Sequence, residues 1–213
     1  MIKGVIFDLD GVITDTAEYH YQAWKALGDK IGIEINRTFN EQLKGVSRQD
    51  SLERILTFGG KEAAFSVAEK EDLMAWKNDF YVSLIQNITP DDVLPGVLPF
   101  LERLNENGIK KAIASASKNA TAILTSLHIL EEFDYVVDAS LIARSKPDPE
   151  VFLEAIKGLN LTATECIGIE DAEAGVAAIQ NAGMTAVSIG TDKSLQKAEI
   201  NLQSTEELSQ LAL

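Results

Sequence analysis

The stretch VIFDLDGVITDT, residues 5–16, begins as an apolar run and ends among acidic and hydroxyl residues. Its β-branched and aromatic side chains predict a buried strand, and Asp8 and Asp10 stand two positions apart at its end. Residues at this spacing in an extended chain point to the same side, so the two carboxylates repel each other unless they share a cation. Gly11 would let the backbone turn sharply beside them. An isolated Asp-x-Asp pair is more often a solvated loop, so the choice depends on the rest of the chain.

Apolar, strand-like runs recur later in the chain, with helical patterns among them. The runs occupy residues 109–114, 135–137, 166–169 and 185–189, and the helical patterns occupy residues 97–107, 120–127, 149–158 and 174–181. This alternation predicts a doubly wound, Rossmann-like α/β core built on a parallel sheet. Sheets of this kind bind ligands beyond the carboxyl ends of their strands, where Asp8 would lie.

The segment between the first strand and the second breaks this alternation, because it contains helical patterns without a convincing strand. Apolar residues such as Leu73, Trp76 and Phe80 recur there at the spacing of one helix face. We therefore expect two units, a core domain of residues 1–15 and 92–213 and a helical domain of residues 16–91. The helical domain would be inserted directly after the first strand.

The composition restricts the partners and the compartment. The chain has 213 residues, of which 33 are acidic and 19 basic, and its net charge of −14 argues against nucleic acid or an anionic membrane as a partner. Cys166 is the only cysteine, so we expect no intrachain disulfide and interpret it as a small buried hydrophobe. No secretory signal is visible, and the uncharged residues 174–191 fit a helix, a turn and a strand better than a membrane span. We expect a cytoplasmic protein.

Polar residues follow the later strand-like runs as well. Ser115 comes at the end of the second run, Lys146 precedes a proline after the third, and Glu170 and Asp171 follow the fourth. Each alone could be a helix cap or a surface charge. Because parallel strands end at the same edge of a sheet, all of them would lie beside Asp8. A hydroxyl, an ammonium and an acidic pair at one edge indicate a catalytic site.

The order DLDG, Ser, Lys-Pro and Glu-Asp resembles the four motifs of the haloacid dehalogenase superfamily of phosphotransferases, and the match spans nearly the whole chain. The resemblance implies that Asp8 is a nucleophile that becomes an aspartyl phosphate and that Asp10 is a general acid and base. It also implies a Mg²⁺ site and a site for the transferring phosphate. The metal ligands would be Asp8, Asp10 (through its carbonyl), Glu170 and Asp171, and the phosphate would bind Ser115 and Lys146.

The helical insert is similar to the cap of the β-phosphoglucomutase family in its YHYQAW and LKGVSRQDSL stretches. The resemblance implies a monomeric mutase that interconverts β-D-glucose 1-phosphate and D-glucose 6-phosphate through β-glucose 1,6-bisphosphate, which also primes the enzyme. Arg48 would bind the phosphate that is not transferred. The substrate-binding residues would be Thr16, His20, Trp24, Lys44, Gly45, Val46, Ser47, Arg48, Ser51 and Lys77 around the cap, and Ser115, Ala116, Ser117, Lys118, Asn119 and Lys146 in the core.

Simpler roles are open for two of the cap residues. His20 and Trp24 are four positions apart on a helix and can both belong to a hydrophobic core, and we expect Trp24 mainly to pack. Arg48 could instead pair with Asp50 or Glu53 on a solvated face.

Two other functions fit the same motifs. A sugar-phosphate phosphatase on this scaffold would release inorganic phosphate instead of an isomer. A non-catalytic protein that binds phosphosugars is less expected, because binding alone needs neither the nucleophile Asp8 nor the acid Asp10.

Overall fold

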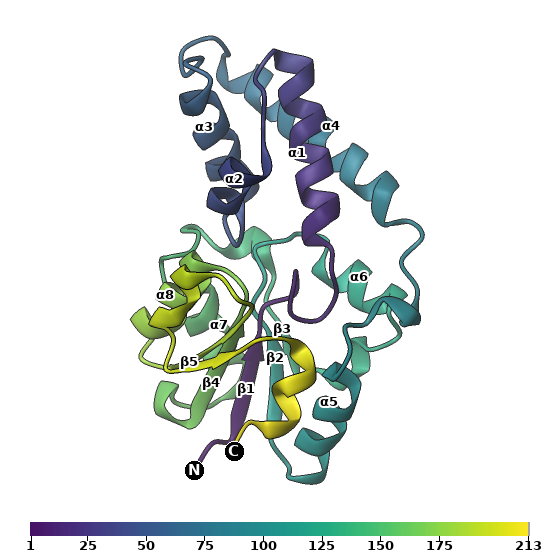
Figure 1. Cartoon of the computed structure of the whole chain (residues 1–213), viewed down its shortest axis with the longest axis vertical. Coiled ribbons are helices and arrows are strands. Elements are labelled where there is room, and N and C mark those ends of the chain that lie inside the picture. The colour runs from purple at the N-terminus through teal and green to yellow at the C-terminus, as the bar shows by residue number, and fades with distance from the viewer. Residues whose placement is uncertain (213) are drawn as a thin grey trace.

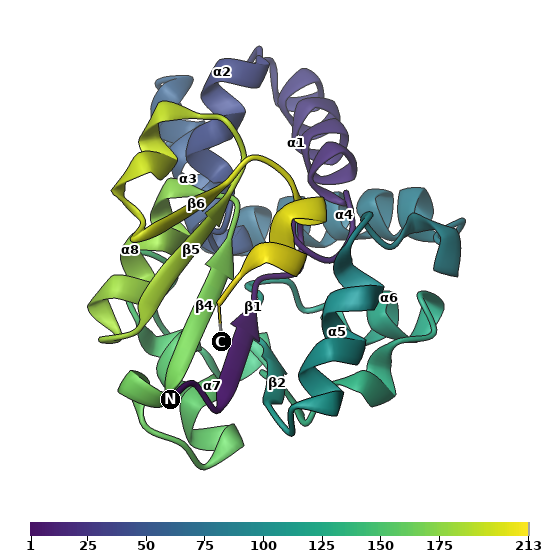
Figure 2. The same ribbon diagram turned by 60° about the horizontal axis from the view of Figure 1, so that its bottom comes forward.

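A computed structural model describes residues 1–212 and has a six-stranded sheet with the strand order β3-β2-β1-β4-β5-β6 (Figure 1 labels β1 to β5, and Figure 2 labels β6). All paired strands are parallel, as the alternation of strands and helices predicts. The strands are β1 (Gly4–Phe7), β2 (Lys110–Ile113), β3 (Tyr135–Val136), β4 (Cys166–Glu170), β5 (Thr185–Ile189) and β6 (Ile200–Leu202).

The central strand β1 positions the site. It pairs with β2 on one side and β4 on the other, so the sheet is extended in opposite directions from it. A crevice forms beyond the carboxyl ends of strands at such a point. All four residues of β1 are buried, because helices cover both faces of a parallel sheet. Asp8, which comes directly after β1, therefore enters this crevice.

Helices α5 (Val97–Glu106), α6 (Ala120–Ser126), α7 (Glu150–Leu159) and α8 (Glu173–Asn181) cover the sheet (Figure 2). Alternate residues of β1 face different layers: Val5 and Phe7 share a hydrophobic cluster with residues of α5 and α6, and Ile6 shares one with residues of α7 and α8. The period of two along a strand accounts for this division. Short 3-10 helices occupy Glu41–Leu43, Pro90–Asp92, Leu130–Glu132, Ala139–Leu141, Ala163–Glu165, Lys193–Lys197 and Thr205–Gln210.

The segment after β1 is helical, as predicted. It contains α1 (Ala17–Ile31), α2 (Arg37–Asn40), α3 (Arg48–Phe58) and α4 (Val67–Ile85), and Figure 1 shows these helices beyond the carboxyl edge of the sheet. They have a hydrophobic cluster of their own, in which Trp24, Leu27, Leu52 and Ile55 are buried. The two chain segments that join the helices to the sheet meet where Thr14 donates a hydrogen bond to the Asp92 carbonyl, 2.8 Å. We refer to these helices as the cap; its boundaries at residues 16 and 91 stay a prediction.

Several expectations can be compared with this architecture. Residues 174–191 fold into most of α8, a turn at Gly183 and strand β5, and no helix in residues 1–212 is long and apolar enough to span a membrane. Cys166 is buried, as expected. The sequence did not predict β6, a strand of only three residues at the sheet edge. A helix-cap role for Asp171 is wrong, because Ala172 holds the N-cap position of α8.

Candidate active site

The strand ends bring the predicted core residues together. Asp8 follows β1, Ser115 lies two residues beyond β2, Lys146 lies in the loop before α7, and Glu170 ends β4. Each is at most 4% exposed, so the sheet edge holds charged groups in a nearly water-free place. Charges are buried at such cost only where partners compensate them.

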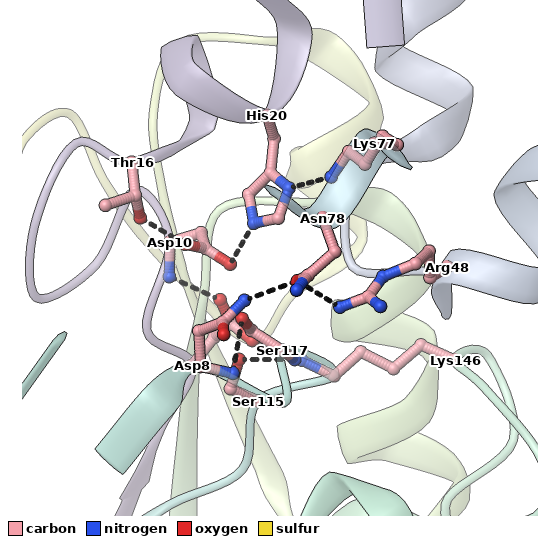
Figure 3. A network of polar contacts seen from close by, with 11 residues as sticks. Asp8, Asp10, Thr16, His20, Arg48, Lys77, Asn78, Ser115, Ser117 and Lys146 are labelled. Atoms are coloured by element: carbon pink, nitrogen blue, oxygen red, sulfur yellow. Dashed lines mark hydrogen bonds and ion pairs between the residues drawn. The ribbon is translucent and has the colours of Figure 1, made fainter. Parts of the chain in front are cut away.

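Lys146 compensates two of the carboxylates. Its Nζ lies 2.5 Å from Asp8 Oδ1 and 2.6 Å from Glu170 Oε1 (Figure 3 shows the contact with Asp8). Burial lowers the pKa of Lys146, but the attraction of Asp8 and Glu170 outweighs it and raises this pKa above its usual value. The lysine therefore stays an ammonium, a fixed positive charge beside the carboxylate of Asp8.

Asp8, Glu170 and Asp171 form an acidic cluster in which one oxygen of each lies within 4.8 Å of the others. Burial, then the charges of Glu170 and Asp8, hold the pKa of Asp171 well above its ordinary range. A cation would relieve this repulsion. Glu170 Oε2 already accepts from the backbone N–H groups of Asp171 and Ala172, whereas the carboxylate of Asp171 has the Lys44 ammonium at a longer distance, with the Nζ at 3.8 Å. The hard oxygen donors of this cluster fit Mg²⁺.

Two glycines make room for the acidic cluster. A Cβ on Gly11, whose φ is +80°, would overlap the Asp171 carboxylate, and a Cβ on Gly175 in α8 would overlap the Glu170 carboxylate. Any other residue at either position would displace an acidic side chain. The GIEDAEAG segment therefore places Gly175 on the helix face that lies against Glu170.

Asp10 has a different environment from Asp8. Its Oδ1 accepts a hydrogen bond from Thr16 Oγ1, and its Oδ2 lies 3.7 Å from His20 Nε2. Burial, then the nearby charge of Asp8, raises the pKa of Asp10 to about 7. A carboxyl group with a pKa near neutrality can both give and take a proton, which is what a general acid and base requires.

His20 connects Asp10 with the cap. Its Nδ1 lies 2.8 Å from Lys77 Nζ, and its ring stacks on Tyr81 with centroids 4.0 Å apart. Burial and the charges of Lys77 and Arg48 hold the pKa of His20 well below its usual value, so the ring is neutral. When Lys77 is an ammonium it can only donate, so in that state Nδ1 accepts from Lys77 and Nε2–H faces Asp10.

Lys77 is buried against aromatic rings rather than paired with a carboxylate. Burial, then Arg48, lowers its pKa to about 7, and its Nζ lies 4.5 Å from the Trp24 ring centroid. Trp24 is 4% exposed and belongs to the cap core, as expected, and its face also borders Lys77.

A second group of cations and amides faces the core from the cap. Arg48, the first residue of α3, donates from Nη2 to Asn78 Oδ1 at 2.6 Å (Figure 3). The alternative that Arg48 pairs with Asp50 or Glu53 is wrong: Glu53 pairs with Lys70 instead, and Asp50 accepts from Ser47 and from Ser145 of the core. The guanidinium thus keeps most of its donors for a ligand.

The predicted residues surround one cavity of about 630 Å³ between cap and core. Three of the predicted residues do not line the cavity but contact a residue on it or beside it. Thr16 contacts Asp10, Asn119 contacts Asn78, and Glu170 contacts Lys146. The predicted residues that line the cavity are Asp8, Asp10, His20, Trp24, Lys44, Gly45, Val46, Ser47, Arg48, Ser51, Lys77, Ser115, Ala116, Ser117, Lys118, Lys146 and Asp171.

Sequence reasoning missed several residues of this region. Asp50, Met74, Ser140 and Ser145 line the cavity, and Asn78 contacts Arg48 beside it. Asn78 directly follows Lys77 in a helix, and a single asparagine in a helical pattern matches no motif. Its position one residue from a predicted substrate-binding lysine was the available signal.

Comparison with known proteins agrees with this geometry. A family model described as haloacid dehalogenase-like hydrolase matches residues 2–183. The β-phosphoglucomutase of Bacillus subtilis (strain 168) is 48% identical over 208 residues, which cover 98% of this chain and 92% of that protein. The crystal structure of β-phosphoglucomutase from Clostridium difficile has a TM-score of 0.96 and 50% identity, covering 98% of this chain and 93% of that one. Protein CbbY of Rhodobacter capsulatus is 31% identical, covering 87% of this chain and 84% of CbbY.

A parallel α/β core with two aspartates at its central strand end and a helical cap above them defines the class of protein. The chain belongs to the haloacid dehalogenase family, and within that family to the β-phosphoglucomutases, a group of intramolecular phosphotransferases.

Proposed function

We propose that this protein interconverts β-D-glucose 1-phosphate and D-glucose 6-phosphate, with β-glucose 1,6-bisphosphate as intermediate and primer. One observation carries the proposal: the cavity has Asp8, Asp10 and Lys146 on its core side and Arg48 on its cap side. A molecule with two phosphates can therefore meet a reacting centre at one end and a guanidinium at the other. A bidentate guanidinium suits a phosphate group.

The acidic cluster fits a resident Mg²⁺. Asp8, Glu170 and Asp171 would hold it with their carboxylates, and Asp10 with its backbone carbonyl. When bound, Mg²⁺ supplies positive charge that offsets the repulsion between a phosphate dianion and the carboxylates.

Asp8 is the proposed nucleophile. One of its carboxylate oxygens attacks the phosphorus of the bound bisphosphate, the bond from phosphorus to the sugar oxygen breaks, and Asp8 becomes an aspartyl phosphate. Lys146 and Ser115 bind the transferring oxygens, because both are buried at the edge from which Asp8 projects. Fixed positive charge at the oxygens that become more negative lowers the barrier.

Asp10 moves the proton that balances each transfer. Protonated Asp10 gives its proton to the sugar oxygen as the phosphoryl group leaves, and ionised Asp10 takes the proton from the sugar hydroxyl that attacks the aspartyl phosphate. Thr16 and His20 contact its two oxygens from the start of the cap and so orient it. The pKa of about 7 allows both directions near neutral pH.

The cap favours transfer to the sugar over transfer to water. Its loop residues Lys44 to Arg48 line the cavity above the acidic cluster, and Lys44 reaches Asp171. A closed cap keeps water from the aspartyl phosphate, and the grip of Arg48 on the second phosphate stabilises that closure. When the aspartyl phosphate has given its phosphoryl group to the hydroxyl of a sugar monophosphate, the resulting bisphosphate turns over, so its other phosphate reaches Asp8.

The deciding experiment separates mutase from phosphatase. The purified protein receives β-glucose 1-phosphate with Mg²⁺ and a trace of the bisphosphate, and D-glucose 6-phosphate and inorganic phosphate are measured together. We expect glucose 6-phosphate to form much faster than free phosphate, and no product of either kind from a folded Asp8→Ala variant. Release of phosphate at least as fast as isomer would contradict the mutase and favour a sugar-phosphate phosphatase. Size-exclusion chromatography in the same buffer tests the expected monomer.

A further inference from the structure

Asn78 of α4 joins three elements that lie far apart in the sequence. Its Oδ1 accepts from Arg48 Nη2 at the start of α3, 2.6 Å away, and from Asn119 Nδ2 at the start of α6, 3.1 Å away. Two of these elements belong to the cap and the third to the core. The amide therefore connects Arg48 directly with the core side of the cavity.

The orientation of each amide in this contact, that is, which side its oxygen faces, follows from the donors and acceptors of its neighbours. Arginine has only donors, so the Asn78 atom that faces Arg48 must be the amide oxygen. The Asn119 atom facing that oxygen must then be its amide nitrogen. The network therefore has one orientation, in which Asn78 accepts and both neighbours donate.

We propose that Asn78 is a positioning residue, which connects the Arg48 guanidinium with Asn119 of the core and so fixes it for binding the phosphate that is not transferred. The inference rests on the proposed mutase function. Asn78 takes one of the five N–H donors of Arg48 and leaves the others for the ligand. Without this anchor, Arg48 would lose rotamer entropy each time it bound a phosphate.

The choice of asparagine at this position also has a chemical reason. An aspartate would accept the same two hydrogen bonds with almost the same shape, but its negative charge would pair with Arg48 and repel the phosphate. A neutral acceptor holds the guanidinium without competing with the ligand's charge. The geometry of Asn78 and its neutral charge therefore contribute separately to phosphate binding. One substitution can remove the hydrogen bonds, and another can keep them while adding a negative charge.

The first test uses Asn78→Ala and Asn78→Asp in the mutase assay. We expect KM for β-glucose 1-phosphate to rise about tenfold in Asn78→Ala, the usual cost of losing one hydrogen bond to a charged group. In Asn78→Asp we expect a larger rise, despite the retained hydrogen bonds. Phosphorylation of Asp8 by acetyl phosphate, which has a single phosphate, should change less than twofold in either variant.

Matched controls separate positioning from folding. Gln86→Ala removes an exposed amide at the end of the same helix and should leave KM unchanged. Alanine has a higher helix propensity than asparagine, so Asn78→Ala should not unfold α4, and its melting temperature checks this. If Asn78 acts through Arg48, Asn78→Ala should weaken binding of glucose 6-phosphate less in an Arg48→Ala background than in the unchanged protein, by calorimetry.

Four results would overturn the proposal. Two concern the mutase assay: an Asn78→Asp variant as active as the unchanged protein, or an unaltered KM in Asn78→Ala. The other two are an equal loss of the sugar and acetyl phosphate reactions in the Asn78 variants, or losses of glucose 6-phosphate binding by Asn78→Ala and Arg48→Ala that are fully additive. Failure of the proposed function looks different. In that case the unchanged protein itself would form no glucose 6-phosphate, whereas an active unchanged protein with insensitive Asn78 variants would overturn only this inference.

Discussion

Asp8 and Asp10 are chemically identical side chains two residues apart, and their surroundings make them different. Asp8 lies against the Lys146 ammonium at 2.5 Å, whereas Asp10 lies against the hydroxyl of Thr16 and the neutral imidazole of His20. Burial and the charge of Asp8 outweigh the nearby lysines, so Asp10 holds its proton more tightly than usual and can transfer it.

Asp10→Asn tests the proton transfer. The amide keeps the shape and the hydrogen bond from Thr16 but cannot give or take a proton. We expect turnover to fall by roughly 10²–10⁴-fold, the usual contribution of a general acid or base. Binding of the bisphosphate, measured by calorimetry, should be retained. A loss of only a few-fold would show that another group moves the proton.

The raised pKa of Asp10 also predicts how stability depends on pH. Its pKa is about 7 in the folded protein against 3.8 ordinarily, so between these values the folded state holds the proton that the unfolded state has lost. The carboxyl's contribution to stability is complete below pH 3.8 and decreases as the pH rises to about 7. Without metal, Asp10→Asn should therefore melt above the unchanged protein at pH 8, by a margin that vanishes near pH 4. The exposed change Asp15→Asn should show no such margin.

Lys146→Ala should be strongly destabilising as well as inactive. It leaves the carboxylates of Asp8 and Glu170 buried without their cation, and removing one partner of a buried ion pair costs about 3–5 kcal/mol. Urea unfolding at pH 7 would measure this loss. The exposed control Lys193→Ala should stay within about 0.5 kcal/mol of the unchanged protein. A Lys146→Ala variant as stable as this control would show that the ion pairs contribute nothing.

At the scale of elements, a helix must approach the acidic cluster closely for the site to form. Helix α8 begins at Glu173, two residues after Asp171, and its Gly175 lies against the Glu170 side chain. Strand β4 and helix α8 can pack this tightly only because that position lacks a side chain. The cap also approaches the acidic cluster closely, because the loop before α3 reaches over the core.

Gly175→Ala tests that packing. In an exposed helix the change would gain up to about 1 kcal/mol from helix propensity. Here the new methyl group would displace Glu170 and separate it from Lys146, so we expect lower stability and a higher Mg²⁺ requirement. The neighbouring change Ala174→Gly measures propensity alone and should cost at most about 1 kcal/mol without altering the Mg²⁺ requirement. A stabilised Gly175→Ala variant would contradict the packing in the structure.

The limits of sequence-based prediction are also clearest for the elements. The strands and helices of the core were predictable because their apolar periodicity is continuous. Strand β6 was not, because three residues at a sheet edge form a strand only through their pairing with β5. The bounds of α7 were predicted to within one residue, although its first turn follows two prolines.

For the whole molecule, a net charge of −14 surrounds a site that is proposed to bind phosphates. The local cations Lys44, Arg48, Lys118 and Lys146 line the cavity and oppose that field where the ligand binds. The acidic surface also favours accumulation of divalent cations near the cluster. Because folding brings Asp8 together with Glu170 and Asp171, folding and metal binding should be coupled.

Mg²⁺ should stabilise the whole protein. A ligand that binds only the folded state adds about 2.7 kcal/mol at a concentration of 100 times its dissociation constant. We expect the melting temperature to rise with Mg²⁺ and to fall in EDTA, and most of this response to disappear in Asp171→Ala. Sodium chloride at matched ionic strength serves as the control. An equal response to both salts would show that the cluster does not bind a divalent metal specifically.

The sequence by itself determined the parallel core, the helical insert and the meeting of Asp8, Ser115, Lys146 and Glu170. These follow from local periodicity and from one topological rule: the carboxyl ends of parallel strands share an edge, so residues distant in the chain become neighbours without any detailed packing.

Only the tertiary structure decided the contacts between cap and core. Asn78 of the cap meets Asn119 of the core across 41 residues of chain. Such contacts depend on how the cap packs on the core, where Ala23 and Tyr81 of the cap join a hydrophobic cluster of the core, and no periodicity within either segment encodes that packing. The same packing partly buries Asp10 and raises its pKa, so this property of Asp10 belongs to the folded molecule.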